Sequence, residues 1–294
     1  MSVREAAYTL EVEMNYQWYP GHMTKAKRMM QEDIKLIDLI IELVDARTPL
    51  SSRNPDIDEL GKNKSRMILL NKSDLADPQA TKQWMEYFEA KGIQTVEVNA
   101  RNGNGLKNIQ AAVAKACAAK IERDRKRGIL NRPVRAMVVG IPNVGKSTFI
   151  NSYAKKACTK TGNKPGVTKG KQWIKLNKTL ELLDTPGILW PKFEDNLIGM
   201  RLAFIGSIND QILYSEELAA DFIKYLDTCY PDCIHSYYGI EKTQDAYECL
   251  QEIARVRRCL GKNETLDIKK SSMILMDDFR SGKLGRITLE LPEE

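Results

Sequence analysis

The chain has 294 residues, of which 43% are hydrophobic and 29% charged, and its formal net charge is +6. These values are typical of a globular protein with one domain of ordinary size and a smaller one. No apolar run is long enough to span a bilayer, which argues against an integral membrane protein or a membrane partner. The first thirteen residues contain three glutamates, which argues against a secretory or mitochondrial leader. We therefore expect a cytoplasmic protein.

The charge is distributed unevenly along the chain. Residues 1–205 contain 34 Lys and Arg against 22 Asp and Glu, whereas residues 206–294 contain 11 against 17. A basic first part favours a polyanionic partner such as a nucleic acid. The densest basic run lies at 120–135. It is either a nucleic-acid contact or a solvated helix end with a linker, and the sequence leaves both interpretations open.

Strands and helices alternate over the first two thirds of the chain. After a basic helix from Thr24 to about Ile37, apolar runs predict strands at 39–44, 66–70, 93–98, 136–139, 172–176 and 180–183. Helices are predicted at 79–91, at 105–124 and from 148. This alternation predicts an α/β fold with a mostly parallel sheet covered by helices on both faces.

The pattern changes near residue 206, beyond which only helices are predicted, at 215–229, 243–260 and 267–281. We therefore predict a disordered extension at 1–14, an α/β domain at 15–205 and a smaller all-helical domain at 206–294.

Residues 140–147, Gly-Ile-Pro-Asn-Val-Gly-Lys-Ser, match the phosphate-binding pattern G-x-x-x-x-G-K-S between a predicted strand and a predicted helix. Lys146 is expected to reach the β- and γ-phosphates and to act in catalysis, and the Ser147 hydroxyl is expected to coordinate Mg²⁺. A chance match in a glycine-bearing loop is the alternative, which the flanking strand and helix disfavour. The predicted nucleotide contacts in this loop are Asn143, Val144, Gly145, Lys146, Ser147 and Thr148.

A second motif, Asn71-Lys72-Ser73-Asp74, fits N-K-x-D. The Asp74 carboxylate can accept hydrogen bonds from N1–H and the 2-amine of guanine, and adenine offers neither donor. The Lys72 stem is expected to pack on the base, and Asn71 to brace the loops. Asn99-Ala100-Arg101 stands in the place of an S-A-K loop, with Asn as a mild departure from Ser. The residues predicted to bind GTP here are Asn71, Lys72, Ser73, Asp74, Asn99 and Ala100.

A third motif, Asp184-Thr-Pro-Gly187, fits D-x-x-G. Asp184 is expected to hold Mg²⁺ through water, and the Gly187 N–H to sense the γ-phosphate. Thr168 is the candidate for the threonine that closes over Mg²⁺. Each short motif is weak alone, but three of them at the carboxyl ends of predicted strands favour a GTP site.

The motifs stand in an unusual order, because N-K-x-D precedes the phosphate loop. In an ordinary GTPase domain it comes last, so the order predicts a circularly permuted GTPase domain. Such a rearrangement is tolerated where the old termini lie close together, and the join falls near 120–133. The segment after Gly187 then leads out to the helical domain. We expect loss of the γ-phosphate to reorient that domain.

This motif order resembles the ribosome biogenesis GTPase A (YlqF-type) family, as do Trp18-Tyr-Pro-Gly-His-Met23, Pro165-Gly-Val-Thr168 and Asp278-Phe-Arg-Ser-Gly-Lys-Leu-Gly285. The resemblance covers nearly the whole chain from Asn15. It implies a GTPase that acts in late assembly of the large ribosomal subunit and is stimulated by that particle. It also implies GTP, GDP and the large-subunit precursor as partners, with ribosomal RNA contacted by the helical tail. We expect a monomer.

One expected group is missing, because Ile188 follows Gly187 where many GTPases place a glutamine that orients the attacking water. The resemblance assigns this role to His22, and the alternative is an interfacial histidine bonded to backbone. The resemblance also assigns a K⁺ ion to Asn143, whose alternative is an ordinary loop residue. A regulatory GTP-binding module with little hydrolysis of its own stays open, and Asp74 disfavours a metabolic P-loop kinase.

Overall fold

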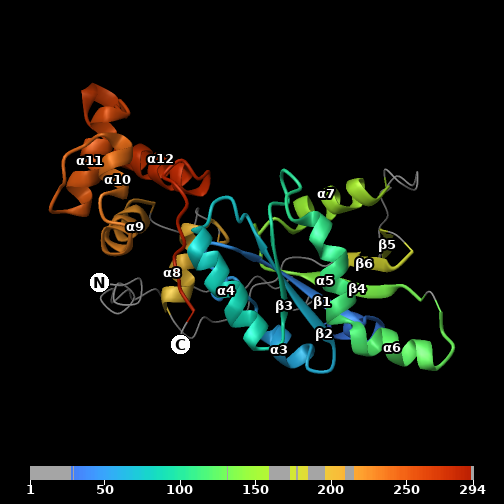
Figure 1. Cartoon of the computed structure of the whole chain (residues 1–294). Helices are drawn as coiled ribbons and strands as arrows, with labels where there is room; N and C mark the ends of the chain where they lie inside the picture. The colour runs from blue at the N-terminus through green and yellow to red at the C-terminus, as the bar shows by residue number, and fades with distance from the viewer. Residues whose placement is uncertain are drawn as a thin grey trace.

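The computed structural model describes residues 28, 30–130, 132–158, 173–176, 178–184, 196–208 and 215–292. They form an α/β part that ends at Asp184 and a helical part that begins at Asn196 (Figure 1). The boundary predicted between residues 205 and 206 stays a prediction. The helix before it, α8 (Asn196–Phe204), packs its Phe204 ring 5.0 Å from the ring of Phe222 in the helical part.

Six strands form one sheet in the α/β part. In chain order they are β1 (Leu39–Asp45), β2 (Ser65–Asn71), β3 (Gln94–Val98), β4 (Val134–Val139), β5 (Trp173–Lys175) and β6 (Leu180–Asp184). Their order in the sheet is β3-β2-β1-β4-β6-β5, and β5 alone runs antiparallel to its neighbour. Every residue of β1 is buried, as expected of a central strand covered on both faces. The predicted mostly parallel α/β fold is confirmed.

Helices cover both faces of the sheet. The bounds are α3 (Asp56–Leu60), α4 (Pro78–Ala90), α5 (Ile109–Ala116), α6 (Ala118–Lys126) and α7 (Lys146–Cys158). The Asp77 side chain caps α4 by accepting hydrogen bonds from the N–H groups of Gln79 and Ala80. Trp84 and Phe88 of α4 form a core with Val44, Ala46, Ile68, Leu70 and Ala76 on one face. The alternate strand residues belong to the main core on the other face.

Two predicted helices differ from the structure. The helix expected at 105–124 begins as a 3-10 turn (Leu106–Asn108) and is split between α5 and α6, because the buried Cys117 has non-helical torsions (φ −102°, ψ 13°). The helix expected at 243–260 is shorter, α11 (Ala246–Val256), because Asp245 caps its start and Arg258 turns to φ 52° after its end. Three helices were not predicted from the sequence: α3, α8 and α10 (Cys233–Tyr238). No helix among the described residues combines the length and apolar character needed to cross a membrane.

The helical part also contains α9 (Ser215–Cys229) and α12 (Ile268–Arg280), and the chain beyond α12 is no longer helical. Gly282 and Gly285 turn it with φ values of 80° and 106°. Residues 283–292, called the C-terminal segment below, then run past α8 to α4, as the red trace in Figure 1 shows. The Trp84 indole N–H donates to the Glu290 carbonyl at 2.9 Å, which fixes the end of the segment on α4.

Candidate nucleotide-binding site

The first two motifs and the aspartate that begins the third come together at one edge of the sheet. Parallel neighbours end at the same edge, and the register aligns Asp45 of β1 with Asn71 of β2 and Val138 of β4 with Asp184 of β6. The phosphate loop leaves β4 at Gly140 on the same edge. Ligands of open α/β sheets bind at such carboxyl ends. The topology therefore gathers the predicted base loop, phosphate loop and D-x-x-G aspartate on one side of the molecule.

The phosphate loop lies tightly between β1 and α7. A Cβ atom on Gly140 would lie 2.7 Å from the carbonyl oxygen of Leu43 in β1, so no side chain fits there. The loop turns through Asn143 and Gly145, whose φ values are 62° and 95°. Helix α7 starts at Lys146, and Ser147 and Thr148 are exposed in its first turn. The N–H groups and positive dipole end of such a helix suit a phosphate.

Asn71 joins the base loop to the phosphate loop. Its Nδ2 donates to the carbonyl of Val144 at 2.7 Å, and its Oδ1 accepts from the N–H of Ala100 at 3.0 Å. A Cβ atom on Gly145 would lie 2.5 Å from this Nδ2, so the approach requires glycine. Asn71 is 2% exposed, which makes both hydrogen bonds costly to lose. Asn71 was expected to brace the loops, and its side chain joins its own loop to the phosphate loop and to the loop that carries Ala100.

A buried ionic cluster lies behind the base loop. Asp45 is completely buried and accepts hydrogen bonds from Arg47 Nε at 2.9 Å and Nη2 at 2.8 Å. The Lys72 ammonium pairs with the same carboxylate at 2.9 Å and also donates to the Asn143 carbonyl at 2.9 Å. Burial raises the pKa of Asp45, but the charges and hydrogen bonds of Arg47 and Lys72 outweigh it and hold the pKa well below its usual range. The ammonium of Lys72 is therefore anchored between β1 and the phosphate loop.

The other two predicted contacts of the base differ in exposure: Asp74 faces solvent, whereas the loop that begins at Asn99 is held by internal hydrogen bonds. Asp74 is exposed, and its side chain shows no hydrogen bond to the part of the chain that the structure describes. Asn99 is buried, and its Oδ1 accepts from the N–H groups of Arg101 and Asn102 at 2.9 and 3.1 Å. The Ala100 N–H already donates to Asn71. A role for this loop in contacting guanine O6 therefore requires one of its N–H groups to change or share its acceptor.

Asn143 connects the phosphate loop to the helical part. Its Nδ2 donates to the carbonyl of Gly206 at 2.7 Å, just beyond the end of α8. The Arg280 guanidinium holds that helix end by donating to the carbonyls of Ala203 at 2.7 Å and Phe204 at 2.9 Å. The amide nitrogen of Asn143 is thus engaged, and its Oδ1 is the atom available to a cation.

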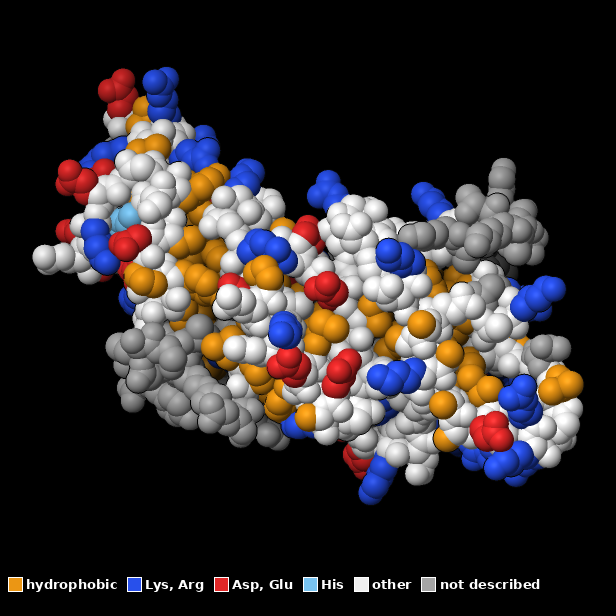
Figure 2. Space-filling model, viewed as in Figure 1, with side chains coloured by type: hydrophobic (Ala, Val, Ile, Leu, Met, Phe, Trp, Pro, Cys, Tyr) orange, Lys and Arg blue, Asp and Glu red, His pale blue; other side chains and the backbone are white. Residues whose placement is uncertain are grey.

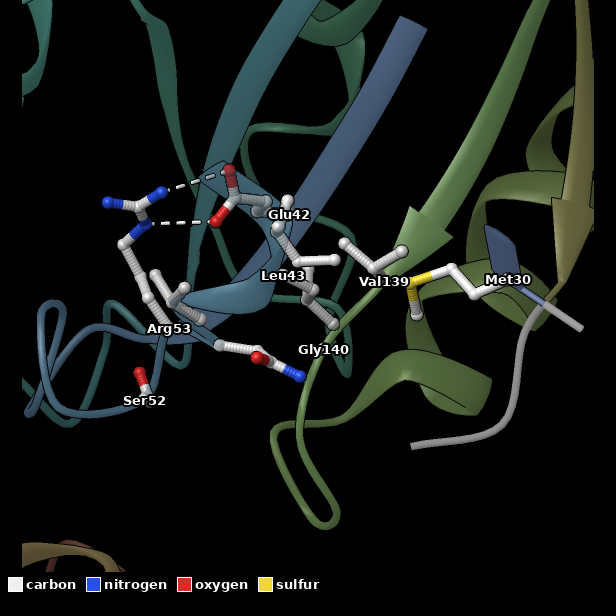
Figure 3. Close-up of a pocket in the computed structure, with 10 residues that line it drawn as sticks. Met30, Glu42, Leu43, Ser52, Arg53, Val139 and Gly140 are labelled. Carbon is white, nitrogen blue, oxygen red and sulfur yellow. Dashed lines mark hydrogen bonds and ion pairs between the residues drawn. The ribbon is translucent and has the colours of Figure 1, made fainter. Parts of the chain in front are cut away.

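A small hollow lies beside the start of the phosphate loop (Figure 3). Met30, Leu43, Val139 and Gly140 line it together with the ion pair of Glu42 and Arg53, whose Oε2 and Nε lie 2.9 Å apart. Its volume of about 10 Å³ holds about one water molecule, so it is not a nucleotide pocket. The buried ion pair instead supports the loop that follows β1.

Some predicted site residues cannot be placed. His22, Thr168 and Gly187 lie outside the described residues, and of Asp184 the structure describes the backbone only. Their roles stay predictions. The donor chemistry nevertheless fits Mg²⁺, which prefers oxygen ligands such as a hydroxyl and a carboxylate. Ser147 lies in the first turn of α7, and β6 brings Asp184 beside β4, from which the phosphate loop leaves.

Four residues that hold the site were not predicted from the sequence: Asp45, Arg47, Arg280 and Arg286, the last of which donates to carbonyls of the base loop. The first two were visible as Asp-Ala-Arg directly after a predicted strand, which is a position where ligand sites form. The last two lie in and just after Asp278-Phe-Arg-Ser-Gly-Lys-Leu-Gly285. That motif carried the family resemblance, but its contacts could not be inferred from its letters.

A phosphate loop, an N-K-x-D loop braced against it by Asn71, and an aspartate at the end of the adjoining strand define the class of P-loop GTPases. A family model described as "50S ribosome-binding GTPase" matches residues 135–230. The ribosome biogenesis GTPase A of Bacillus cereus is 49% identical over 96% of this chain and 95% of that protein. The chain belongs to the ribosome biogenesis GTPase A family.

More distant relatives and solved structures agree. The ribosome biogenesis GTPase A of Thermotoga maritima is 32% identical over 94% of this chain and 95% of that protein. The mitochondrial ribosome-associated GTPase 1 of Bos taurus is 31% identical over 93% of this chain and 88% of that protein. The crystal structure of GNP-bound YlqF from T. maritima matches with a TM-score of 0.66 and 28% identity, covering 92% of this chain and 99% of that chain. The predicted family and its GTPase fold are confirmed.

Proposed function

We propose that this GTPase acts in late assembly of the large ribosomal subunit and hydrolyses GTP faster when that particle is bound. One observation carries the nucleotide part of the proposal: Asn71 holds the predicted guanine loop beside the phosphate loop by donating to the Val144 carbonyl at 2.7 Å. The family model described as a 50S ribosome-binding GTPase supports the large subunit as partner. We also infer a monomeric, cytoplasmic protein.

In this proposal each motif has one task. Asp74 accepts two hydrogen bonds from the guanine edge, and the Lys72 stem packs on the base. Lys146 neutralises charge on the transferring phosphoryl group, which lowers the barrier because that charge grows in the transition state. His22 orients the attacking water in place of the missing glutamine. A solved GDP-bound YlqF structure that matches this chain supports a guanine nucleotide as the ligand.

Two cations assist the reaction in this account. Mg²⁺, held by Ser147, Thr168 and through water by Asp184, would neutralise the β- and γ-phosphates. K⁺ would lie at Asn143, whose Oδ1 is available because Nδ2 donates to Gly206. A monovalent cation there supplies the positive charge that an arginine finger supplies elsewhere.

An RNA contact is supported at the far end of the α/β part. Helix α6 and the turn after it carry Arg123, Arg125 and Arg127, for which no described residue provides an ion pair. Leu130 beside them is 69% exposed. Figure 2 shows Lys and Arg side chains gathered at this end, with hydrophobic ones beside them. Phosphate contact by the arginines and base contact by the apolar side chains would suit single-stranded or irregular RNA.

The test is multiple-turnover GTP hydrolysis in K⁺ buffer, with and without purified large-subunit precursor particles. We expect the particles to raise kcat of the full chain about ten-fold or more, and exchange of K⁺ for Na⁺ at constant ionic strength to lower it. We expect His22→Ala to keep its affinity for GTP and to lose most of the stimulated rate.

The outcomes separate the alternatives. A rate that particles do not change would favour a regulatory GTP-binding module, provided that particles still bind. If particles stimulate His22→Ala to the wild-type rate, His22 does not orient the attacking water. The proposed role in ribosome assembly would not be affected. Small-subunit particles serve as the matched control and should give the basal rate.

A further inference from the structure

The C-terminal segment lies directly on the loop that carries Asp74. Arg286 donates from Nη2 to the carbonyl of Ser73 and from Nε to the carbonyl of Ala76, both at 2.8 Å. The next residue, Ile287, donates its N–H to the carbonyl of Leu75 at 3.0 Å. Three carbonyls of the base loop therefore accept hydrogen bonds from two adjacent residues that lie more than 200 positions away in the chain.

These contacts hold the backbone on both sides of Asp74. The carbonyl of Ser73 belongs to the peptide unit immediately before Asp74, and the carbonyl of Leu75 belongs to the second unit after it. On the other side, Ser73 donates its N–H to Val98 at 3.2 Å and Leu75 donates to Lys72 at 2.9 Å. The exposed Asp74 side chain has no described partner of its own. Its aim therefore depends on how the backbone on either side is held.

The C-terminal segment is itself tied to the helical part. Thr288 exchanges hydrogen bonds with the Tyr230 hydroxyl at 3.0 Å in both directions. Glu290 is buried and pairs with Arg201 of α8 at 3.0 Å. A Cβ atom on Gly282 would lie 2.6 Å from the Leu75 side chain, so the turn that begins the segment also presses on the base loop. The base loop thus meets a segment that is anchored to α8 and to the residue that follows α9.

We propose that Arg286 is a positioning residue for guanine recognition, which holds the carbonyls of Ser73 and Ala76 so that Asp74 faces the base. The proposal rests on the assignment of guanine recognition to Asp74 made above. Because binding free energies are reciprocal, a guanine nucleotide seated on Asp74 strengthens the attachment of the C-terminal segment, and release of the segment weakens guanine binding. Movements of the helical part can therefore change the affinity for the nucleotide through the C-terminal segment.

The test compares GDP with IDP, whose hypoxanthine base keeps N1–H but lacks the 2-amine. The ratio of the two dissociation constants measures the amine contact of Asp74, and we expect about ten-fold for the wild-type chain. We expect Arg286→Ala to reduce this ratio about three- to ten-fold toward one. Arg286→Lys, which can reach only one of the two carbonyls, should give an intermediate ratio. Lys242→Ala is the control, since it removes a surface cation that pairs with Asp232 at 3.3 Å in the helical part.

A loss of general stability would weaken GDP and IDP binding equally and leave the ratio unchanged, and that result would overturn the proposal. If Arg286→Ala does not fold, the ratio of Arg286→Lys decides in the same way.

The Asp74→Ala variant separates the role of Arg286 from the assignment of guanine recognition to Asp74. If Asp74→Ala keeps the wild-type ratio of the GDP and IDP dissociation constants, Asp74 does not recognise guanine. A ratio lost in Asp74→Ala but kept in Arg286→Ala would remove only the role of Arg286. In the double variant, we expect the ratio of Asp74→Ala alone.

Discussion

Replacement of Asp74 by asparagine is expected to weaken GDP binding roughly 10²–10⁴-fold, because two donors of the base lose a charged acceptor. The same change should create affinity for xanthine nucleotides. Xanthine carries an oxygen where guanine carries the 2-amine, so the asparagine NH₂ can donate to it while the amide oxygen still accepts from N1–H. Dissociation constants for GDP and XDP, measured by calorimetry, check both parts.

ADP is the control nucleotide for the Asp74→Asn variant. Adenine offers neither donor to Asp74, so ADP should bind the wild type and the variant equally weakly. Asp74 is well suited to the test because its side chain is exposed and has no described partner. The substitution therefore leaves the packing of the loop intact. A variant that still preferred GDP over XDP would remove Asp74 from base recognition.

Asp45→Asn is expected to lower the free energy of unfolding by about 3–5 kcal/mol, because it leaves a buried guanidinium without its carboxylate. Arg47 is 1% exposed and has no other acidic partner among the described residues. The Phe279 ring lies 5.0 Å from its Cζ, and its buried Nη1 has no hydrogen-bond partner among the described residues. Lys72 would also lose its anchor, so we expect weaker nucleotide binding as well. Urea unfolding at pH 7 measures the change in stability.

The pH dependence of unfolding gives an independent check on Asp45. Its pKa in the folded protein lies well below the ordinary value of 3.8, so its contribution to stability is fully present above about pH 5. That contribution is lost as the pH falls below about 4 toward the folded pKa, and Asp45→Asn should flatten this part of the curve.

Asp58→Asn is the matched control for Asp45→Asn. Its carboxylate is 53% exposed, and Glu42 still pairs with Arg53 and Arg66 without it, so a change below about 1 kcal/mol is expected. Equal losses for both variants would contradict the special role of Asp45.

Local patterns predicted most of the α/β part because most of its strands are largely buried apolar runs bounded by polar or glycine residues. Strand β5 differs, since none of its three residues is buried. The run predicted at 66–70 became β2 (Ser65–Asn71), and the helix predicted at 79–91 became α4 (Pro78–Ala90). The bracing role of Asn71 could also be predicted, since the parallel order of the strands places both loops on one edge. Motif letters and topology were sufficient for these features.

Long-range contacts explain what could not be predicted. Glu290 accepts hydrogen bonds from the N–H groups of Leu50 and Ser51 at 2.5 and 2.8 Å, across about 240 positions of sequence. Nothing local in the last ten residues indicates that they lie on α4 and on the base loop. The pairing of Asp45 with Lys72 and the ring contact of Arg47 were hidden in the same way. The pairing with Lys72 depends on the neighbouring strands, and the contact of Arg47 with Phe279 depends on how the helical part is seated.

We infer that nucleotide binding at the sheet edge is coupled to the helical part. Hydrogen exchange tests it most directly at the amides of Ile287 and Leu289, which donate to Leu75 at 3.0 Å and Arg47 at 2.8 Å. We predict slower exchange at both amides with GDP bound than without nucleotide, and a different pattern in the helical part with a non-hydrolysable GTP analogue. The amide of Gly128, beyond α6, should stay unchanged. Identical protection of Ile287, Leu289 and the helical part in all three states would contradict the coupling.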